Sequence, residues 1–366
     1  MSVTYYLGAG ASAKKIPCVA DLCKEIREMA VFIKGNSTQE EISYSFNGKH
    51  KINLGSDKRE RSIQIIEEFC NELDGQLSID TLAKIYWIQN DRFKLTRLKS
   101  ILFASLIFWE RKGIDQRYLN FWATITSVHS TLIKDSPGYI EFPGTINVLS
   151  WNYDSQLERA FREIFPNADD IWDAHGKTNG KNIFKYTGVN FKKLNGSVSM
   201  PASFSIGSPG AKDNGLYDMT EYQMAYFIAD IIGDQQGIFY DQIEGLKFCW
   251  EHSPPSIIQD NSFKDNYYKI DTTEVLVVIG YTFPSINHSL DFGLIKTMKN
   301  LKKVYFQGAN RADAERIKDY FQAVLPESHS NIKLIPIDSN GFFIPPEATI
   351  EIEKNDISMR SGSTSL

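Results

Sequence analysis

The sequence predicts an α/β fold of the Rossmann type, a mainly parallel sheet flanked by helices, and two observations carry this prediction. Short runs of β-branched and aromatic residues alternate with segments of helical periodicity, which is the pattern of βαβ units. The three clearest strand candidates, which begin near residues 3, 145 and 274, each end in a polar turn. With 366 residues, the chain is long enough for two lobes or for one domain with insertions.

The first predicted strand, residues 3–7, leads into a glycine-rich turn made of Gly8, Ala9, Gly10, Ala11 and Ser12. The two glycines lack a Cβ atom and can adopt positive φ, so the backbone N–H groups of such a turn can approach a phosphate. The lysines that follow can open a helix, whose dipole adds to this attraction. With Ala13 the stretch fits the relaxed G-x-G-x-x-A dinucleotide fingerprint, although Asp21 comes too early to be its ribose-binding acid. An ordinary strand-to-helix connection explains the turn equally well.

A helical segment is expected after this first unit. Residues 35–60 are polar and rich in turn-forming pairs, which indicates a loop or a small hairpin. From Ser62 to about Ile133, apolar residues recur at spacings of three and four, which predicts helices with one apolar face each. The longest apolar run, Ile101 to Trp109, is far shorter than the roughly 20 residues needed to cross a bilayer and predicts a buried helix.

The second predicted strand, residues 145–150, ends in the polar stretch Trp151, Asn152, Tyr153 and Asp154. Ligands of open parallel sheets bind beyond the carboxyl ends of the strands. Asn152 and Asp154 are therefore expected near the glycine-rich turn if the two strands are central neighbours. Asn and Asp are also frequent helix caps, so both side chains can instead cap the helix that starts near Ser155.

The third region begins with residues 207–270, which look irregular and are expected to form a second insertion. The most β-branched strand of the chain follows at 274–279 and ends in the turn of Gly280, Tyr281 and Thr282. A strand, a helix and a strand then complete the sheet between residues 303 and 337. These elements give a core of residues 1–34, 145–206 and 271–340, a helical insertion at 35–144, a second insertion at 207–270 and a tail at 341–366.

The composition narrows the classes of function. A hydrophobic content of 42% and a charged content of 23% are typical of a globular protein, and a net charge of -5 gives no general reason to bind nucleic acid. Glycines stand where a signal peptide would be apolar, so a cytoplasmic protein without a membrane partner is expected. No C-x-x-C pair occurs, which predicts free thiols and no zinc site for Cys18, Cys23, Cys70 and Cys249.

The motifs GAGAS, WNYD and GYTFP occur in this order, and the ordered set resembles the sirtuin (silent information regulator) superfamily. It is most similar to the prokaryotic sirtuin-like NADases associated with antiphage defence. The resemblance covers residues 3–29, 145–200 and 272–325, roughly half of the chain. It implies that Gly8, Ala9, Gly10, Ala11 and Ser12 hold the NAD phosphates, that Pro17 belongs to the family's short I-P element, and that Gly280, Tyr281 and Thr282 line the adenosine ribose.

The resemblance also implies that Asn152 lies against the nicotinamide ribose and orients an attacking water, while Asp154 shapes the loop. The implied reaction breaks the bond between nicotinamide and ribose. Positive charge builds up on the ribose as this bond breaks, so polar groups are needed on the opposite face. A side-chain amide meets this need at any pH, because its carbonyl accepts hydrogen bonds from water or ribose while its N–H donates.

The family's general base, a histidine in a K-L-H-G-S element, is replaced here. The matching string is Lys193, Leu194, Asn195, Gly196 and Ser197. An amide cannot take a proton from a ribose hydroxyl at neutral pH as an imidazole can. Three explanations stay open: an engineered change that traps substrate, a natural protein that binds NAD or hydrolyses it weakly, or a replacement base at His175.

Without the zinc module, protein deacylation is not expected, and water is the natural acceptor. The expected activity is hydrolysis of NAD, the substrate, to nicotinamide and ADP-ribose. The chain is expected to be the NAD-depleting effector of a prokaryotic antiphage defence system, held inactive until triggered, as a homo-oligomer or with a second defence protein. The insertions are candidates for gating or partner contact. The alternative is a catalytically silent NAD or ADP-ribose-binding module that controls assembly, whereas the missing ribose-binding acid disfavours a dehydrogenase.

Overall fold

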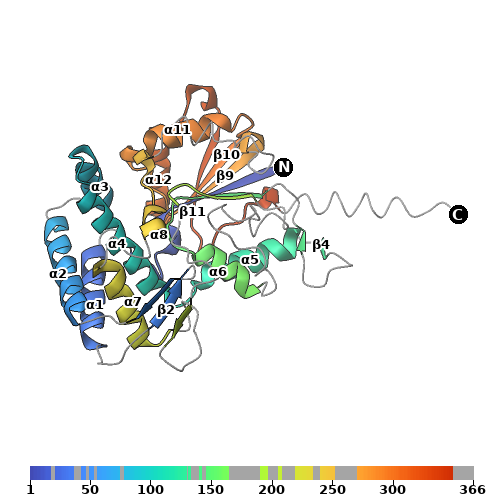
Figure 1. The fold of residues 1–366 in the computed structure, drawn as a ribbon. Helices are drawn as coiled ribbons and strands as arrows, with labels where there is room; N and C mark the ends of the chain where they lie inside the picture. Colours follow the sequence, from blue (N-terminus) through green and yellow to red (C-terminus); the bar gives the residue numbers. More distant parts are fainter. Residues whose placement is uncertain are drawn as a thin grey trace.

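The computed structural model confirms the predicted α/β fold (Figure 1). A parallel sheet has helices on both faces, and a helical lobe lies beside it. The structure describes residues 1–17, 21–36, 43–46, 49–52, 56–74, 78–129, 131–132, 140–141, 146–164, 190–196, 205–207, 219–233, 240–251 and 270–348.

The central sheet has six parallel strands in the order β11-β10-β9-β1-β6-β7. Their bounds are β1 Ser2–Leu7, β6 Ile146–Ser150, β7 Asn190–Lys193, β9 Thr273–Ile279, β10 Lys303–Gln307 and β11 Lys333–Ile337. From β1 the chain first builds outward through β6 and β7, and it then returns to the other side of β1 with β9. The winding therefore reverses between β1 and β9, which is the topological switch point where such sheets bind ligands.

Both faces of the sheet are covered, which explains why its central strands are apolar almost throughout. Val3, Tyr5 and Leu7 face α5 (Gln116–His129) and α6 (Gln156–Ile164). Tyr6 faces the opposite way, toward the cluster that includes α11 (His288–Thr297) and α12 (Arg311–Gln322). Side chains alternate between the two clusters, as the strand period of two residues requires.

The helical lobe has its own apolar core. It contains α1 Leu22–Gly35, α2 Ser56–Leu73, α3 Ile79–Ile88, α4 Arg92–Glu110, α7 Glu221–Gly233 and the short α8 Tyr240–Glu244. The helices expected between Ser62 and Ile133 are thus present. However, α5, which was expected in the helical insertion, packs on the sheet with α6. α1, which was expected in the sheet core, packs in the helical lobe.

The expectation that residues 207–270 are irregular is wrong where α7 lies. Every residue of α7 from Gln223 to Gly233 is buried. A helix that is covered on all sides has no polar face, so its sequence lacks the three-four periodicity by which the other helices were predicted. α7 packs against α2 and α4 and completes the core of the helical lobe.

Smaller elements complete the fold. Of the two alternatives expected for residues 35–60, a loop or a small hairpin, the structure shows a hairpin of β2 Ser43–Phe46 and β3 Lys49–Ile52. β8 Ser205–Gly207 joins it in one antiparallel sheet. Strands β4 Thr131–Leu132 and β5 Ile140–Glu141 form a second antiparallel pair. A tail was expected from residue 341 onward. Its first described part instead packs on the sheet, where Phe342 and Ala348 are buried in the same cluster as Tyr5.

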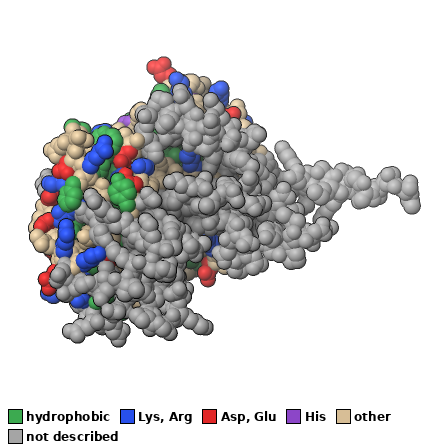
Figure 2. Space-filling view, in the orientation of Figure 1, with side chains coloured by type: hydrophobic (Ala, Val, Ile, Leu, Met, Phe, Trp, Pro, Cys, Tyr) green, Lys and Arg blue, Asp and Glu red, His purple; other side chains and the backbone are tan. Residues whose placement is uncertain are grey.

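The surface of the helical lobe carries hydrophobic side chains among lysines and arginines (Figure 2). Of the exposed large hydrophobic residues of the protein, Trp87, Ile88 and Phe93 lie at the turn from α3 to α4. Within the described part of the chain, no helix is both long enough and apolar enough to span a membrane.

Candidate functional site

Three strand-end loops meet at the switch point of the sheet. The N–H of Gly10 donates to the carbonyl of Gly280 at 3.0 Å, which joins the loop after β1 to the loop after β9. On the other side, Nδ2 of Asn152 donates to Oγ of Ser12 at 3.2 Å, which joins the loop after β6 to the same turn. Leu7 pairs with both Ser150 and Ile279, so the three strands end at one level.

Contact between two loops explains the glycines of the first turn. A Cβ atom on Gly8 would lie 2.6 Å from Cα of Tyr281, and one on Gly10 would lie 2.8 Å from Cα of Gly280. Gly8 has an extended backbone with φ of -120°, whereas Gly280 has φ of +60°. Positive φ is therefore needed at Gly280, and the glycines at 8 and 10 serve close backbone approach.

The helix expected directly after the glycine-rich turn does not begin there. A short 3-10 helix, η1 (Ala9–Ser12), follows β1, and α1 begins at Leu22. The N–H groups of Gly8, Gly10 and Ala11 all donate to carbonyls within the protein. In this conformation these three N–H groups are not free to bind a phosphate, and no long helix begins at the turn. Ala9 is exposed and Gly10 half-buried, so the turn still presents its outer edge to solvent.

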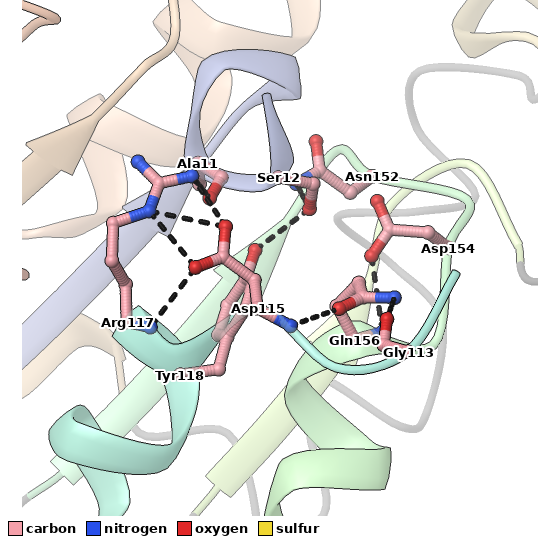
Figure 3. A network of polar contacts seen from close by, with 9 residues as sticks. All are labelled: Ala11, Ser12, Gly113, Asp115, Arg117, Tyr118, Asn152, Asp154 and Gln156. Atoms are coloured by element: carbon pink, nitrogen blue, oxygen red, sulfur yellow. Dashed lines mark hydrogen bonds and ion pairs between the residues drawn. The ribbon is translucent and has the colours of Figure 1, made fainter. Parts of the chain in front are cut away.

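Asn152 is held with its amide in one orientation. Its side chain is buried, its own N–H donates to Oγ of Ser150 at 3.1 Å, and Nδ2 donates to Ser12. Figure 3 shows the carbonyl oxygen of Asn152 pointing away from Ser12. The amide thus uses its donor on Ser12 and directs its acceptor away from that hydroxyl.

Asp154 has the helix-capping role that the sequence left open for both residues. Its Oδ1 accepts a hydrogen bond from the N–H of Gln156, the first residue of α6, at 3.1 Å. Capping therefore explains Asp154, whereas Asn152 is turned toward Ser12 instead. Nζ of Lys193 donates to the backbone carbonyl of Asp154 and lies 3.0 Å from Oε1 of Glu158, so the end of β7 supports this loop.

Asn195 lies beside the Asn152 loop with an unused acceptor. The ladder between β6 and β7 continues through the hydrogen bond from the N–H of Leu194 to the carbonyl of Ser150, at 2.8 Å. Asn195 is 7% exposed, and its Nδ2 donates to the carbonyl of Trp151 at 3.3 Å. Its buried Oδ1 has no hydrogen-bond partner among the described residues.

No described histidine side chain takes the place of the missing base. His175 lies outside the described residues. His288 and His329 bond through Nε2 to the backbone carbonyls of Phe283 and Met298, at 2.8 and 3.0 Å. Both imidazoles have structural contacts of this kind. Of the polar side chains predicted for the reaction, the described residues bring Asn152 and Asn195 to the same loop, since Nδ2 of Asn195 donates to the carbonyl of Trp151.

The loop after β9 presents only part of its motif to solvent. Thr282 is exposed, whereas the side chain of Tyr281 is buried. Pro17, in the segment after the first turn, is half-buried. The Tyr281 ring stacks on Trp151 with centroids 5.5 Å apart, and its hydroxyl donates to Oδ2 of Asp291 at 2.9 Å. The Tyr281 side chain is thus a structural support, and contact with a ribose here would fall to the backbone and to Thr282.

Asp291 is a buried carboxyl group below these loops. It also accepts a hydrogen bond from the hydroxyl of Tyr6 at 2.5 Å. Burial raises the pKa of Asp291 to about 7, although the hydrogen bonds from Tyr6 and Tyr281 favour the ionised form. The group joins β1, the loop after β9 and α11.

Sequence reasoning missed a second set of polar residues, which the start of α5 brings to the site (Figure 3). Tyr118 bonds through its hydroxyl to Oγ of Ser12, with the oxygens 2.9 Å apart, and Nη2 of Arg117 donates to the carbonyl of Ala11 at 2.9 Å. These residues lie within a region expected to be an insertion, and no local motif marks them. Only the packing of α5 on the sheet reveals them.

Comparison with models of known protein families gives no match, and comparison with curated proteins gives no significant match. Among the residues that the structure describes, no group of His, Cys, Asp or Glu side chains is arranged to hold a metal ion.

Proposed function

We propose that this protein hydrolyses NAD to nicotinamide and ADP-ribose. The observation that carries the proposal is the orientation of Asn152, whose amide N–H is anchored on Ser12 and whose carbonyl oxygen points away from that anchor. This acceptor lies beside the glycine-rich turn after β1, the strand at the switch point of a doubly wound parallel sheet, where dinucleotides bind in such folds.

The proposed chemistry needs acceptors near the ribose rather than a strong base. As the glycosidic bond breaks, nicotinamide leaves with the bonding electron pair and the ribose becomes cationic at C1′. The carbonyl of Asn152 would accept a hydrogen bond from the attacking water and orient it toward C1′. The unpartnered Oδ1 of Asn195 would accept a hydrogen bond from a ribose hydroxyl. Water then adds to C1′, and its proton passes to solvent.

The phosphates of NAD would lie along the outer edge of the glycine-rich turn. Ala9 and Thr282 are exposed there, on the two loops that Gly10 and Gly280 join. Because the N–H groups of Gly8, Gly10 and Ala11 are already engaged, this part of the site would hold the pyrophosphate less closely than a free glycine-rich loop.

The biological part of the proposal rests on the resemblance to sirtuin-like defence NADases. In that setting the chain would be the cytoplasmic, NAD-depleting effector of a prokaryotic antiphage system, kept inactive until a signal arrives. A second copy or a second defence protein would bind it. The exposed Trp87, Ile88 and Phe93 of the helical lobe support a protein partner for this lobe.

A direct assay tests the activity. Purified protein is incubated with NAD, and released nicotinamide is followed by proton NMR for the original chain, Asn195→His and Asn152→Ala. Restoring an imidazole should raise the rate by about 10²-fold or more, since general base catalysis contributes this much. Asn152→Ala should abolish release in either background. Absence of nicotinamide from both the original chain and Asn195→His would contradict the proposal.

The second candidate is a catalytically silent module that binds NAD or ADP-ribose and controls assembly. The amide at position 195 favours it, since no described histidine side chain is placed to act as the base. This candidate predicts that NAD and ADP-ribose raise the melting temperature while neither the original chain nor Asn195→His releases nicotinamide. A rise in nicotinamide with Asn195→His would decide for the hydrolase.

A further inference from the structure

The junction between α4 and α5 reaches from the helical lobe to the candidate site. α4 ends at Glu110, and α5 begins at Gln116. Between them, the N–H of Asp115 donates to Oε1 of Gln156 at 2.7 Å, and Nε2 of Gln156 donates to the carbonyl of Gly113 at 3.3 Å. The junction is therefore bonded to the first residue after the Asn152 loop.

The same junction is bonded to the glycine-rich turn. Arg117 donates from Nη2 to both the carbonyl of Ala11, at 2.9 Å, and Oδ2 of Asp115, at 2.6 Å. Asp115 is buried, so this paired guanidinium is held in a fixed place and its bond to Ala11 has a fixed direction. Figure 3 shows Arg117 and Asp115 on one side of the turn and Asn152 on the other.

Tyr118 is the link to the reacting end of the site. Its hydroxyl lies 2.9 Å from Oγ of Ser12, and this oxygen accepts the hydrogen bond from Nδ2 of Asn152. Burial raises the pKa of Tyr118 well above its ordinary value, so the phenol stays protonated and acts as a hydrogen-bonding group only. Its ring packs edge-on against Phe342, with centroids 4.7 Å apart, which fixes where the hydroxyl lies.

We infer that Tyr118 is a positioning residue, which orients the Asn152 amide through the hydroxyl of Ser12 and through its own contact with that amide. Without the phenol, the Ser12 hydroxyl loses one of its two partners and can rotate away from Nδ2. The Asn152 amide then has no fixed donor contact, and its carbonyl no longer points in one direction. This inference rests on the proposed function for its kinetic consequence, but the bond chain itself is independent of that function.

The test compares Tyr118→Phe with Tyr5→Phe. Both tyrosines are buried in the same apolar cluster, and Tyr5 packs edge-on against Phe121, with centroids 4.9 Å apart. Each change removes one phenol oxygen and keeps the ring. Tyr118→Phe should lower kcat for nicotinamide release by about 10-fold with KM for NAD changed by less than about 3-fold, since misplacement of a reacting group costs rate rather than binding. Tyr5→Phe should change neither constant appreciably.

Ser12→Ala provides a second variant. It should reproduce the fall in kcat, and the double variant Ser12→Ala, Tyr118→Phe should be less slow than the product of the two single effects, because both residues hold the same Asn152 amide. Multiplying effects would overturn the inference.

A measurement without activity separates this inference from the proposed function. The side-chain amide signals of Asn152 in nitrogen-proton NMR spectra are assigned by their loss in Asn152→Ala. They should shift in Tyr118→Phe and stay unchanged in Tyr5→Phe, whether or not any form releases nicotinamide. Unchanged Asn152 signals in Tyr118→Phe would overturn the positioning role even if the protein hydrolyses NAD. Shifted signals without nicotinamide release would leave the positioning role standing and remove the hydrolase.

Discussion

At the scale of single residues, the candidate site depends on two loops that touch through glycine. Gly280 has positive φ, and a Cβ atom on it would lie 2.5 Å from the backbone nitrogen of Ala11. The G-x-G pattern could be identified from the sequence, but its reason could not, because the partner of Gly10 lies 270 positions away in the chain. A phosphate and a neighbouring loop both require the same absence of a side chain.

Gly280→Ala should therefore lower the free energy of unfolding by at least about 2 kcal/mol, through backbone strain and overlap with the first turn. Gly341→Ala is the matched control, because nothing lies within 4 Å of the added Cβ atom and its φ is not positive. Urea unfolding of both variants checks this. Equal stability of the two variants would show that the loops can separate without cost.

Asp291 makes the stability depend on pH. Its pKa is raised from 3.8 to about 7 in the folded protein. Between these values the unfolded chain has lost the proton and the folded chain keeps it, so the free energy of unfolding falls as pH rises. Below pH 3.8 and above about pH 7, the protonation of Asp291 is the same in both states, so this group does not change the pH dependence of the free energy of unfolding. The raised pKa corresponds to at most about 4 kcal/mol over this window.

Asp291→Asn should remove this slope, because an amide does not titrate. The measurement is urea unfolding of both forms at several pH values from about 4.5 to 8. Relative to the original chain, the variant should gain stability as pH rises. Parallel curves for the two proteins would assign the pH dependence to other groups.

At the scale of elements, Glu110 joins the end of α4 to the start of α6. Its carboxylate accepts hydrogen bonds from the N–H and the hydroxyl of Ser155, at 2.6 and 2.5 Å, and its carbonyl accepts one from Nη1 of Arg159 at 2.6 Å. Burial raises the pKa of Glu110, while nearby Arg159 opposes this effect. The buried side chain of Glu110 thus links the helical lobe to the residue that follows the Asn152 loop.

Glu110→Ala should cost about 3 kcal/mol of stability, because buried donors lose a charged acceptor. Glu110→Gln keeps one acceptor oxygen and should cost about 1 kcal/mol. Thermal and urea unfolding of the two variants checks this order. If Glu110→Ala is no less stable than Glu110→Gln, the carboxylate does not fasten α4 to α6.

The elements also show where sequence patterns are informative. The three-four spacing of apolar residues predicts the amphipathic helices of the first insertion, and runs of β-branched and aromatic residues that end in polar turns predict the buried strands of the sheet. α7 was missed because it is buried on every side, and the role of α5 was missed because Tyr118 and Arg117 act on residues about 106 positions earlier in the chain. Contacts between distant elements are set by tertiary packing and leave no local signal.

At the scale of the whole molecule, the strand order explains why three separated motifs meet. β1 lies between β6 and β9, and the strands run parallel, so their carboxyl ends share one edge. The sequence predicts that Asn152 and Asp154 lie near the glycine-rich turn if β1 and β6 are neighbours. The strands are neighbours and Asn152 contacts Ser12, whereas Asp154 bonds to the start of α6 instead. The sequence could not indicate that a helical lobe would be bonded to the same edge through the junction of α4 and α5.

Hydrogen-deuterium exchange with and without NAD tests most directly whether these three loops form one site for NAD. Binding should slow exchange together in peptides that cover residues 8–12, 150–155 and 279–283. NAD that leaves all three stretches unchanged, or that protects a different part of the chain, would contradict the account.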